Sequence, residues 1–469
     1  MDEKKITLYI SEGGDDSNEG TVEKPLWSVA EALDRIRGKL YREACLIITG
    51  SVTEVSARDA MIDIAGKGLP VIYMQGGERP GILNAKGLNN RVMYISGGNK
   101  VYLGENLVIR GGITQGSGGA GITIEDGALF LQGAEISDND AGFGMGGGVY
   151  VSGRGEFVME SGLITRNKTK MHGGGVFPDD GGKFIMRGGT ISYNEAVLSG
   201  GGVFVGVDAE FTMSGGLIEK NQVGGEKIVK IAGVSVPYGQ GGGVHVCQDA
   251  RFTMLNGRIC ENRAIAVGRE DSAGSGGGVF VATDGIFIAE KGSIVQNGVM
   301  NWGGGVYVKG SFTLGAACTI ANNIARLGGG GVHVAGKQGV FTMKSGLLMN
   351  NYTGGKGGAV CVMEDSIFTM EGGLVTRNSA YQIGNAFAVN GLLTVNGGAV
   401  IDNVYPPPEE SKEKDAETDT SQEKAQCVVV IDDTGKLVIH AGEIDGKIAM
   451  KKANQMEDLR EKKEEEETS

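Results

Sequence analysis

The sequence predicts an all-β fold: a right-handed single-stranded parallel β-helix, or solenoid, of about 27 residues and three strands per coil, with an N-terminal capping helix. The first observation is a phrase that recurs along the chain. It consists of three glycines, a Val-x-Val run, a Phe-x-Met run and an Ile-x-x-Asn unit, and two copies start at Gly146 and Gly173. A fixed period of this size is the signature of a solenoid, in which each coil packs only on its neighbours.

The second observation is the content of one period. It holds three short apolar runs with period-two alternation, separated by Gly and Asn clusters, which is typical of strands and turns. Parallel crossovers are right-handed by default. The residue after the glycines marks the register and is expected to point inward, at Ile122, Val149, Val176, Val203, Val244, Val279, Val306, Val332, Val360, Phe387 and Val429. We expect a second inward column of Phe157, Phe184, Phe211 and Phe252.

Residues 1–92 are predicted to form an N-terminal cap. Ser28 and Glu31 have the spacing of a capping box, which favours a helix over about residues 27–42. Ala30, Leu33 and Ile36 then share one face with Leu40, and this face is expected to cover the open end of the first coil. Irregular first coils follow, with strands at residues 46–48 and 71–74.

Residues 93–403 are predicted to form the regular coils, and the Asn of each Ile-x-x-Asn unit supports this. Asn tolerates left-handed backbone at tight turns, and its amide can both donate and accept along a stack. We therefore expect a hydrogen-bonded asparagine ladder. Its members are Asn139, Asn167, Asn194, Asn221, Asn262, Asn297, Asn323, Asn351, Asn378 and Asn403.

Three periods are longer than the rest, and each expands between the ladder Asn and the next glycines, at residues 223–240, 263–275 and 404–426. The third begins with three prolines and continues without aromatic residues, so 404–426 is predicted to be an acidic disordered insertion. The register resumes at residues 427–446 as the last coil. Residues 447–469 are predicted to be a charged C-terminal tail.

Composition limits the partners. The formal net charge is −13, which argues against a nucleic-acid or anionic-membrane partner, and no apolar run is long enough for a transmembrane segment. The six cysteines include no C-x-x-C pair, so neither a zinc site nor a thioredoxin-like motif is indicated, and buried thiols are expected. We expect a monomer that needs no metal and no cofactor.

Some of these residues resemble known groups. Gly357-Gly358-Ala359-Val360 and the Ile-x-x-Asn units resemble the GGA[I/L/V] and FxxN repeats of polymorphic outer membrane proteins, over roughly residues 118–403. Most copies here have a third Gly, and Ile replaces the Phe of FxxN. The stretch from Asp16 to Pro25 resembles the start of a β-helix of the pectate-lyase-like superfamily. The first resemblance implies adhesion at a bacterial surface, and the second implies a fold shared by lyases, hydrolases and binding proteins.

A catalytic reading has one candidate within the coils. Asp179 and Asp180 are adjacent acidic residues after Pro178, and His172 precedes them at a corner. Pectinolytic β-helix enzymes need paired carboxylates or a calcium cluster on an exposed strand face. A turn explains an Asp pair beside glycines equally simply. No catalytic residue is therefore assigned, and an enzyme is the less favoured alternative.

The favoured ligand site lies on the Val-x-Val strands. If both valines point inward, the residue between them points outward, and a stripe of rings follows one outer face. Such a stripe either binds ligands or stabilises the sheet by stacking. The inserts at 223–240 and 263–275 are expected to wall one side of it. The stripe consists of Tyr150, Phe177, Phe204, His245, Phe280, Tyr307 and His333.

The sequence thus leaves two hypotheses. The first is a non-catalytic, adhesin-like β-helix protein that binds a glycan or a host or bacterial surface protein. The second is a carbohydrate-active lyase or hydrolase of the pectate-lyase-like fold. An extracellular or cell-surface location is expected from the resemblance. The chain starts with charged residues and then a strand, not with the apolar region of a signal peptide, so a cytoplasmic location stays open.

Overall fold

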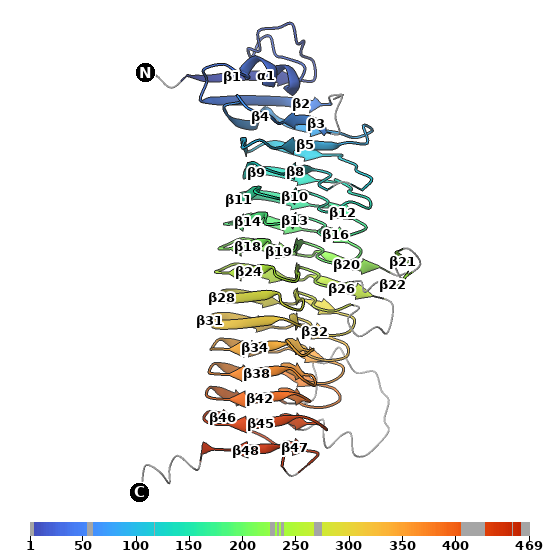
Figure 1. Cartoon of the computed structure of the whole chain (residues 1–469), viewed down its shortest axis with the longest axis vertical. Coiled ribbons are helices and arrows are strands. Elements are labelled where there is room, and N and C mark those ends of the chain that lie inside the picture. Colours follow the sequence, from blue (N-terminus) through green and yellow to red (C-terminus); the bar gives the residue numbers. More distant parts are fainter. Residues whose placement is uncertain are drawn as a thin grey trace. The chain divides into compact units, whose positions relative to one another are not determined.

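The computed structural model describes residues 4–53, 60–116, 118–225, 230–231, 234–235, 239–266, 274–404, 427–452 and 454–460. The chain divides into two compact units, Met1–Gln222 (unit 1) and Val223–Ser469 (unit 2). Within each unit the chain is a parallel β-solenoid of about 28 residues per turn with three sheets, and strands of successive coils lie one above another (Figure 1). The predicted fold class is confirmed.

Unit 1 begins with strand β1 (Lys5–Ser11) and the helix α1 (Val29–Ile36). The helix is shorter than predicted, and its buried face is made by Val29, Ala32, Leu33 and Ile36. Two predicted members of that face are wrong: Ala30 is exposed, and Leu40 lies beyond the helix with 86% exposure. The Ser28 Oγ accepts from the Glu31 backbone N–H at 3.1 Å, so half of the expected capping box is formed.

Three sheets can be followed in unit 1. They are called sheets A, B and C here, and each is built from a particular part of the repeat. Sheet A contains the Phe-x-Met and Leu-Ile segments: β1, β2 (Glu43–Val52), β4 (Val71–Asn84), β6 (Lys100–Leu103), β7 (Leu107–Arg110), β9 (Ala128–Ser137), β11 (Glu156–Thr165), β14 (Lys183–Met186), β15 (Thr190–Ser192), β18 (Glu210–Met213) and β19 (Leu217–Glu219). Sheet B contains the Val-x-Val segments: β3 (Ala60–Ile64), β5 (Arg91–Ile95), β8 (Ile122–Ile124), β10 (Val149–Val151), β13 (Val176–Pro178) and β17 (Val203–Val205). Sheet C is made by two-residue strands after the ladder Asn: β12 (Lys168–Thr169) and β16 (Glu195–Ala196).

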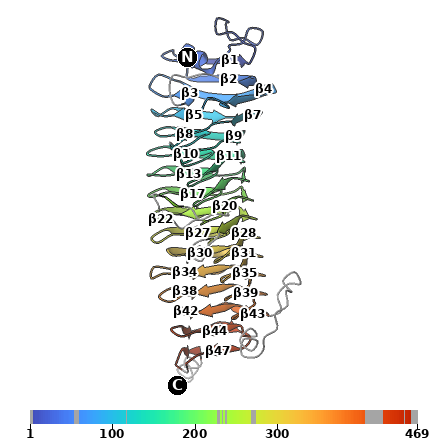
Figure 2. The ribbon, with the colours of Figure 1, turned by 90° about the vertical axis from the view of Figure 1, so that its right-hand side faces the viewer.

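In unit 2 the same three sheets recur (Figure 2). Sheet A contains β24 (Arg251–Met254), β25 (Arg258–Cys260), β28 (Ile286–Val295), β31 (Ser311–Ala321), β34 (Val340–Met343), β35 (Leu347–Met349), β38 (Ile367–Met370), β39 (Leu374–Thr376), β42 (Leu392–Val395), β43 (Ala399–Ile401), β45 (Lys436–Ile439), β46 (Glu443–Ile444) and β48 (Met456–Asp458). Sheet B contains β23 (Val244–Val246), β27 (Val279–Val281), β30 (Val306–Val308), β33 (Val332–Val334), β37 (Val360–Val362), β41 (Phe387–Val389), β44 (Val429–Ile431) and β47 (Ile448–Met450). Sheet C contains β26 (Arg263–Ala266), β29 (Gly298–Val299), β32 (Ile324–Ala325), β36 (Tyr352–Thr353) and β40 (Ser379–Ala380).

Two boundaries differ from the prediction. The last coil is not the end of the solenoid, because β47 pairs with β44 and β48 pairs with β45. One further coil therefore occupies part of the stretch predicted as a charged tail. The insert at 223–240 includes an antiparallel pair, β21 (Lys230–Ile231) with β22 (Val234–Ser235), and β20 (Gln222–Gly225) precedes it. Most of the other two inserts and residues 461–469 lie outside the described residues.

The inward columns are confirmed within each unit. Val149 pairs with Val176 and Val176 with Val203, and each is fully buried. Phe157, Phe184 and Phe211 form a second buried column, with ring centroids 4.9 and 4.6 Å apart and nearly parallel planes. In unit 2 the equivalent column starts with Phe252 and Phe287, 4.7 Å apart. The rings are stacked at the spacing of neighbouring strands, which is a favourable packing arrangement for aromatic side chains in a core.

The asparagine ladder is also confirmed, within each unit. The Nδ2 of Asn167 donates to Oδ1 of Asn194 at 3.0 Å, and Asn194 donates in the same way to Asn221 at 3.0 Å. In unit 2 the chain of amides runs from Asn262 to Asn403 with N–O distances of 2.9 to 3.1 Å. Each such amide is at least 97% buried.

The expectation that the ladder Asn itself takes the left-handed backbone of the turn was wrong. The left-handed residue of the turn is not the Asn but the residue before it, for example Arg166 at φ 54° and Tyr193 at φ 55°. The same holds before every ladder position, from Asp138 to Asp402. The Asn is selected for its buried amide, whereas the preceding residue carries the backbone strain and points to solvent.

Candidate functional site

The ring stripe is in register but it is not an open face. In unit 1, Tyr150 pairs with Phe177. The Phe177 ring contacts Tyr150 edge-on at 5.6 Å and Phe204 at 4.7 Å. Phe177 and Phe204 are buried, and only Tyr150 keeps partial exposure. The ring of His172, from the corner before the glycines, lies 4.6 Å from Phe204.

In unit 2 the stripe is a stack of parallel rings. His245, Phe280, Tyr307 and His333 follow one another at centroid distances of 4.8, 5.0 and 5.0 Å, with planes within 16°. All four are buried. Trp302, from the corner before β30, lies 4.7 Å from the His333 ring at 41°.

The predicted exposed platform is therefore wrong, because the corner segments cover the outward column. In several coils the first glycine of the triplet packs against the base of a stripe side chain: a Cβ on Gly200 would lie 2.7 Å from Cβ of Phe204, and one on Gly329 would lie 2.7 Å from Cβ of His333. Both glycines have positive φ, 66° and 63°. A binding role for the half-buried Tyr150 stays a prediction. The wall expected from the inserts falls largely outside the described residues.

The Asp179–Asp180 pair lies in a turn. Asp180 has φ 49° and is followed by Gly181 at φ 79°, while Asp208, Asp249, Asp284 and Asp365 take the left-handed conformation in the turns of other coils one position later, at the place of Gly181. Asp tolerates this conformation, so the turn explains the acidic residue. Asp179 accepts a hydrogen bond from the Tyr150 hydroxyl at 3.3 Å. Burial raises the pKa of Asp179, and burial together with the Asp179 charge raises the pKa of Tyr150 to about 12.

Two buried imidazoles accompany the stripe. Burial lowers the pKa of His172 to about 4. Burial, with a smaller effect of the Lys309 ammonium, lowers the pKa of His333 to about 3. Within the described residues the Nδ1 atoms of both rings have no hydrogen-bond partner. Both side chains are therefore neutral at physiological pH and act as ring surfaces.

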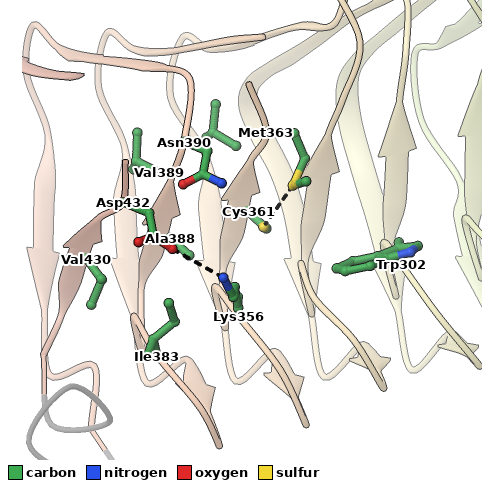
Figure 3. A pocket seen from close by; sticks show the side chains of 11 residues that line it. Trp302, Lys356, Cys361, Met363, Ile383, Ala388, Val389, Asn390, Val430 and Asp432 are labelled. Atoms are coloured by element: carbon green, nitrogen blue, oxygen red, sulfur yellow. Dashed lines mark hydrogen bonds and ion pairs between the residues drawn. The ribbon is translucent and has the colours of Figure 1, made fainter. Parts of the chain in front are cut away.

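A pocket of about 80 Å³ lies on unit 2 where the ring stack ends (Figure 3). Its floor is formed by the middle residues of three sheet B strands, Cys361, Ala388 and Val430, which are all buried. Trp302 and Met363 line its walls. In Figure 3, Lys356 and Ile383 approach from one side and Met363 and Asn390 from the other. The result is an apolar cavity with a polar rim.

The rim of this pocket contains the ion-paired carboxylate of Asp432 and the amide of Asn390. Lys356 Nζ lies 3.2 Å from Asp432 Oδ2, and Lys451 Nζ lies 3.8 Å from Asp432 Oδ1. The side-chain amide of Asn390 makes no hydrogen bond within the described part of the chain. Burial raises the pKa of the Cys361 thiol to about 12, so the floor carries no charge.

A second feature of unit 2 is a set of apolar side chains in the sheet C strands and in the one or two residues after them, here called the corner patch: Met300, Ile324, Leu327, Tyr352 and Tyr381. Ile324 is 55% exposed, and Met300, Tyr381 and Leu327 are 42, 42 and 39% exposed. Ile324 pairs in register with Tyr352, so their side chains are neighbours. The sequence carried a signal for this patch, since Ile324 and Tyr352 directly follow a ladder Asn where other coils have Lys168, Glu195 or Arg263.

The expectations for membrane-spanning segments and for the cysteines can be compared with the structure. No helix among the described residues is long and apolar enough to cross a bilayer. None of the six cysteines forms a disulfide. Four of them are buried, as expected, whereas Cys45 and Cys247 are partly exposed.

Comparison with known proteins adds no relative: no family model, no curated protein and no solved structure matches the chain. The parallel β-solenoid and its asparagine ladder rest on the structure itself.

Proposed function

We propose that this chain is a non-catalytic, adhesin-like β-helix protein, extracellular or at a cell surface, that binds a protein ligand through the corner patch of unit 2. The observation that carries the proposal is the exposure of apolar side chains in and just after the sheet C strands, at Met300, Ile324, Leu327, Tyr352 and Tyr381. The resemblance of the repeats to those of polymorphic outer membrane proteins supports the surface location and the adhesive role.

The composition of the patch favours a protein over a glycan. Aromatic residues, Met and Arg are enriched at protein interfaces, and exposed Arg326 lies between Ile324 and Leu327 in the chain. Aliphatic side chains such as Met300 and Ile324 cannot form hydrogen bonds with sugar hydroxyls. Exposed apolar side chains gathered on successive coils are costly in water, and in soluble proteins such gatherings mark interaction sites.

The structure offers less to the enzyme alternative. Its candidate acid, Asp180, lies in a tight turn and takes the left-handed backbone conformation at φ 49°. Asp179 is engaged with Tyr150. The two carboxylates are neighbours in one turn, whereas a glycoside-cleaving pair flanks the scissile bond from two sides.

The test is a binding screen against arrayed host and bacterial surface proteins and against arrayed glycans. The patch variant is Ile324→Ser with Tyr381→Ser. A matched control is Ile367→Ser with Tyr193→Ser, because both of these side chains are also exposed but lie outside the corner patch. We expect a protein ligand whose affinity falls at least about tenfold in the patch variant and is unchanged in the control.

Two results would count against the proposal. A protein ligand that binds wild type and patch variant equally would move the site away from sheet C. Binding of glycans alone would replace the protein ligand by a sugar.

A further inference from the structure

The pocket of unit 2 lies where a regular column of rings stops. At the middle position of the sheet B strands, Phe280, Tyr307 and His333 stack in parallel. The next residue in register after His333 is Cys361, followed by Ala388 and then Val430. Three coils in succession thus have a small or aliphatic side chain where the preceding coils have a ring.

We propose that this pocket binds a single six-membered aromatic ring bearing a hydroxyl group, which occupies the place of the absent rings. The pocket is about 80 Å³, roughly half of a cavity that encloses benzene, so a single ring would fill it and project from its mouth, while a sugar chain or a fused polycycle is too large. Its floor of Cys361, Ala388 and Val430 has no charged group, and Trp302 and Met363 provide the aromatic and sulfur contacts that rings favour.

The rim selects the substituent. The amide of Asn390 has a donor and an acceptor, both without a partner among the described residues, and it borders the apolar floor. A phenolic hydroxyl can both donate to and accept from such an amide. At the mouth Asp432 is paired with Lys356 and Lys451, and Lys451 is also paired with Asp433, so the charges balance and the rim favours a neutral ligand over an ion.

The alternative occupants fit less well. A hydroxyl-rich sugar would bury polar groups against side chains that cannot hydrogen-bond to them. A metal ion would need the Cys361 sulfur as a thiolate, yet this thiol lies 3.9 Å from the Met363 sulfur on a buried apolar floor.

Trp302 makes the proposal measurable. The chain has two tryptophans, and the other, Trp27, is 42% exposed in unit 1, so Trp27→Phe leaves Trp302 as the single reporter. This protein is titrated with p-cresol, toluene and cyclohexanol while Trp302 fluorescence is followed. We expect a saturable change with p-cresol, roughly three- to tenfold weaker binding of toluene for the lost hydrogen bond, and weaker binding of the non-planar cyclohexanol.

The ring has two possible sources, a free phenol or a tyrosine side chain of a partner protein. N-acetyl-tyrosinamide distinguishes them. If it binds as well as p-cresol, the pocket accepts a tyrosine with its backbone attached. If p-cresol alone binds, the ligand is a free small molecule. Both results support a phenol pocket, whereas absence of a saturable signal with either compound overturns it.

Two variants locate the site. Ala388→Phe restores a ring to the column and is expected to abolish p-cresol binding. Asn390→Leu is expected to remove the preference for p-cresol over toluene while toluene binding remains. Asn396→Leu, at an exposed asparagine of the same unit, is the matched control and is expected to bind like wild type. Unchanged p-cresol binding in a folded Ala388→Phe protein, or an unchanged preference in Asn390→Leu, refutes the site. Neither result bears on the corner patch.

Discussion

At the scale of single residues, two neighbouring positions in the turn that ends each Ile-x-x-Asn unit have different roles. One takes the left-handed backbone, and the other supplies the buried amide. The residue before the Asn takes the left-handed backbone and is variable: Asp138, Arg166, Tyr193 and Lys220 in unit 1. The Asn itself is buried and its amide joins the ladder. A side chain that satisfies buried backbone carbonyls and its own neighbour in the stack cannot be replaced by another residue type without a loss of hydrogen bonds.

Asn194→Ala tests the ladder. Asn194 Nδ2 donates to the Ile164 carbonyl at 2.9 Å, and its Oδ1 accepts from the backbone N–H of Asn167 at 3.0 Å. The substitution leaves these buried groups without a partner, so we expect the free energy of unfolding to fall by about 1–3 kcal/mol. Chemical denaturation measures it, with exposed Asn396→Ala as a control. A midpoint equal to that of wild type would mean that water replaces the amide.

His333 makes stability depend on pH. The folded state binds a proton there only near pH 3, whereas an unfolded histidine does so near about pH 6.5. Between these values the unfolded chain binds more protons. The contribution of His333 is therefore complete above about pH 6.5 and is lost as pH falls towards 3.

The matched variant is His333→Phe, since Phe280 occupies the same column position in unit 2. From about pH 7.5 to about pH 5 we expect wild type to lose roughly 2 kcal/mol more unfolding free energy than the variant. Denaturation curves at the two pH values give the difference. Equal losses would show that His333 is accessible to protons in the folded state.

At the scale of elements, the N-terminal helix is held by more than its own cap. The Ser28 hydroxyl accepts from the Glu31 N–H and donates to Asp16 Oδ2 at 2.8 Å, while the Ser28 N–H donates to Asp16 Oδ1 at 2.9 Å. Glu31 does not close the capping box because its carboxylate pairs with Arg35 at 2.7 Å. A carboxylate from the preceding loop replaces the expected partner.

Ser28→Ala tests this cap. We expect a loss of about 1–2 kcal/mol, because the first turn of α1 loses an acceptor and Asp16 loses a donor. Ser17→Ala is the control, since its hydroxyl bonds the exposed Asp15 instead. Thermal unfolding of both variants is the measurement. Equal shifts would mean that Ser28 contributes no more than a surface hydroxyl.

At the scale of the whole molecule, the same coil is repeated through both units, and repetition builds columns instead of an isolated catalytic centre. Columns of one residue type suit packing and wide binding surfaces. An acid–base pair instead needs two different groups held across a substrate. Function in this fold is therefore expected where the repetition is broken, as at the end of the ring stack and on the corner patch.

We accordingly expect no lyase or hydrolase activity on polygalacturonate or on common plant and bacterial glycans. The assay is product formation from each polysaccharide, with and without added calcium. Asp180→Asn is the informative variant. Product that forms with wild type and disappears with this variant would contradict the non-catalytic reading and restore the enzyme hypothesis.

The sequence by itself determined the coil. The spacing of glycines, valines and phenylalanines predicted which strands stack and which side chains point inward, and Val149, Phe157 and Asn194 lie where the period requires. The spacing is local and recurs in every coil, so each further copy of the repeat supports the same strand register. It also predicted the register of Tyr150, Phe177 and the later rings correctly.

Only the tertiary structure decided what covers those rings. Alternation within a strand tells which side a residue faces, but not whether a neighbouring segment folds over that side. The corner residues His172 and Trp302 lie outside the strand pattern, and their contacts with Phe204 and His333 bury the stripe. The pocket beside Cys361 likewise depends on volumes left between coils. The exposure of an outward side chain is a property of the packed corners, and periodicity does not encode it.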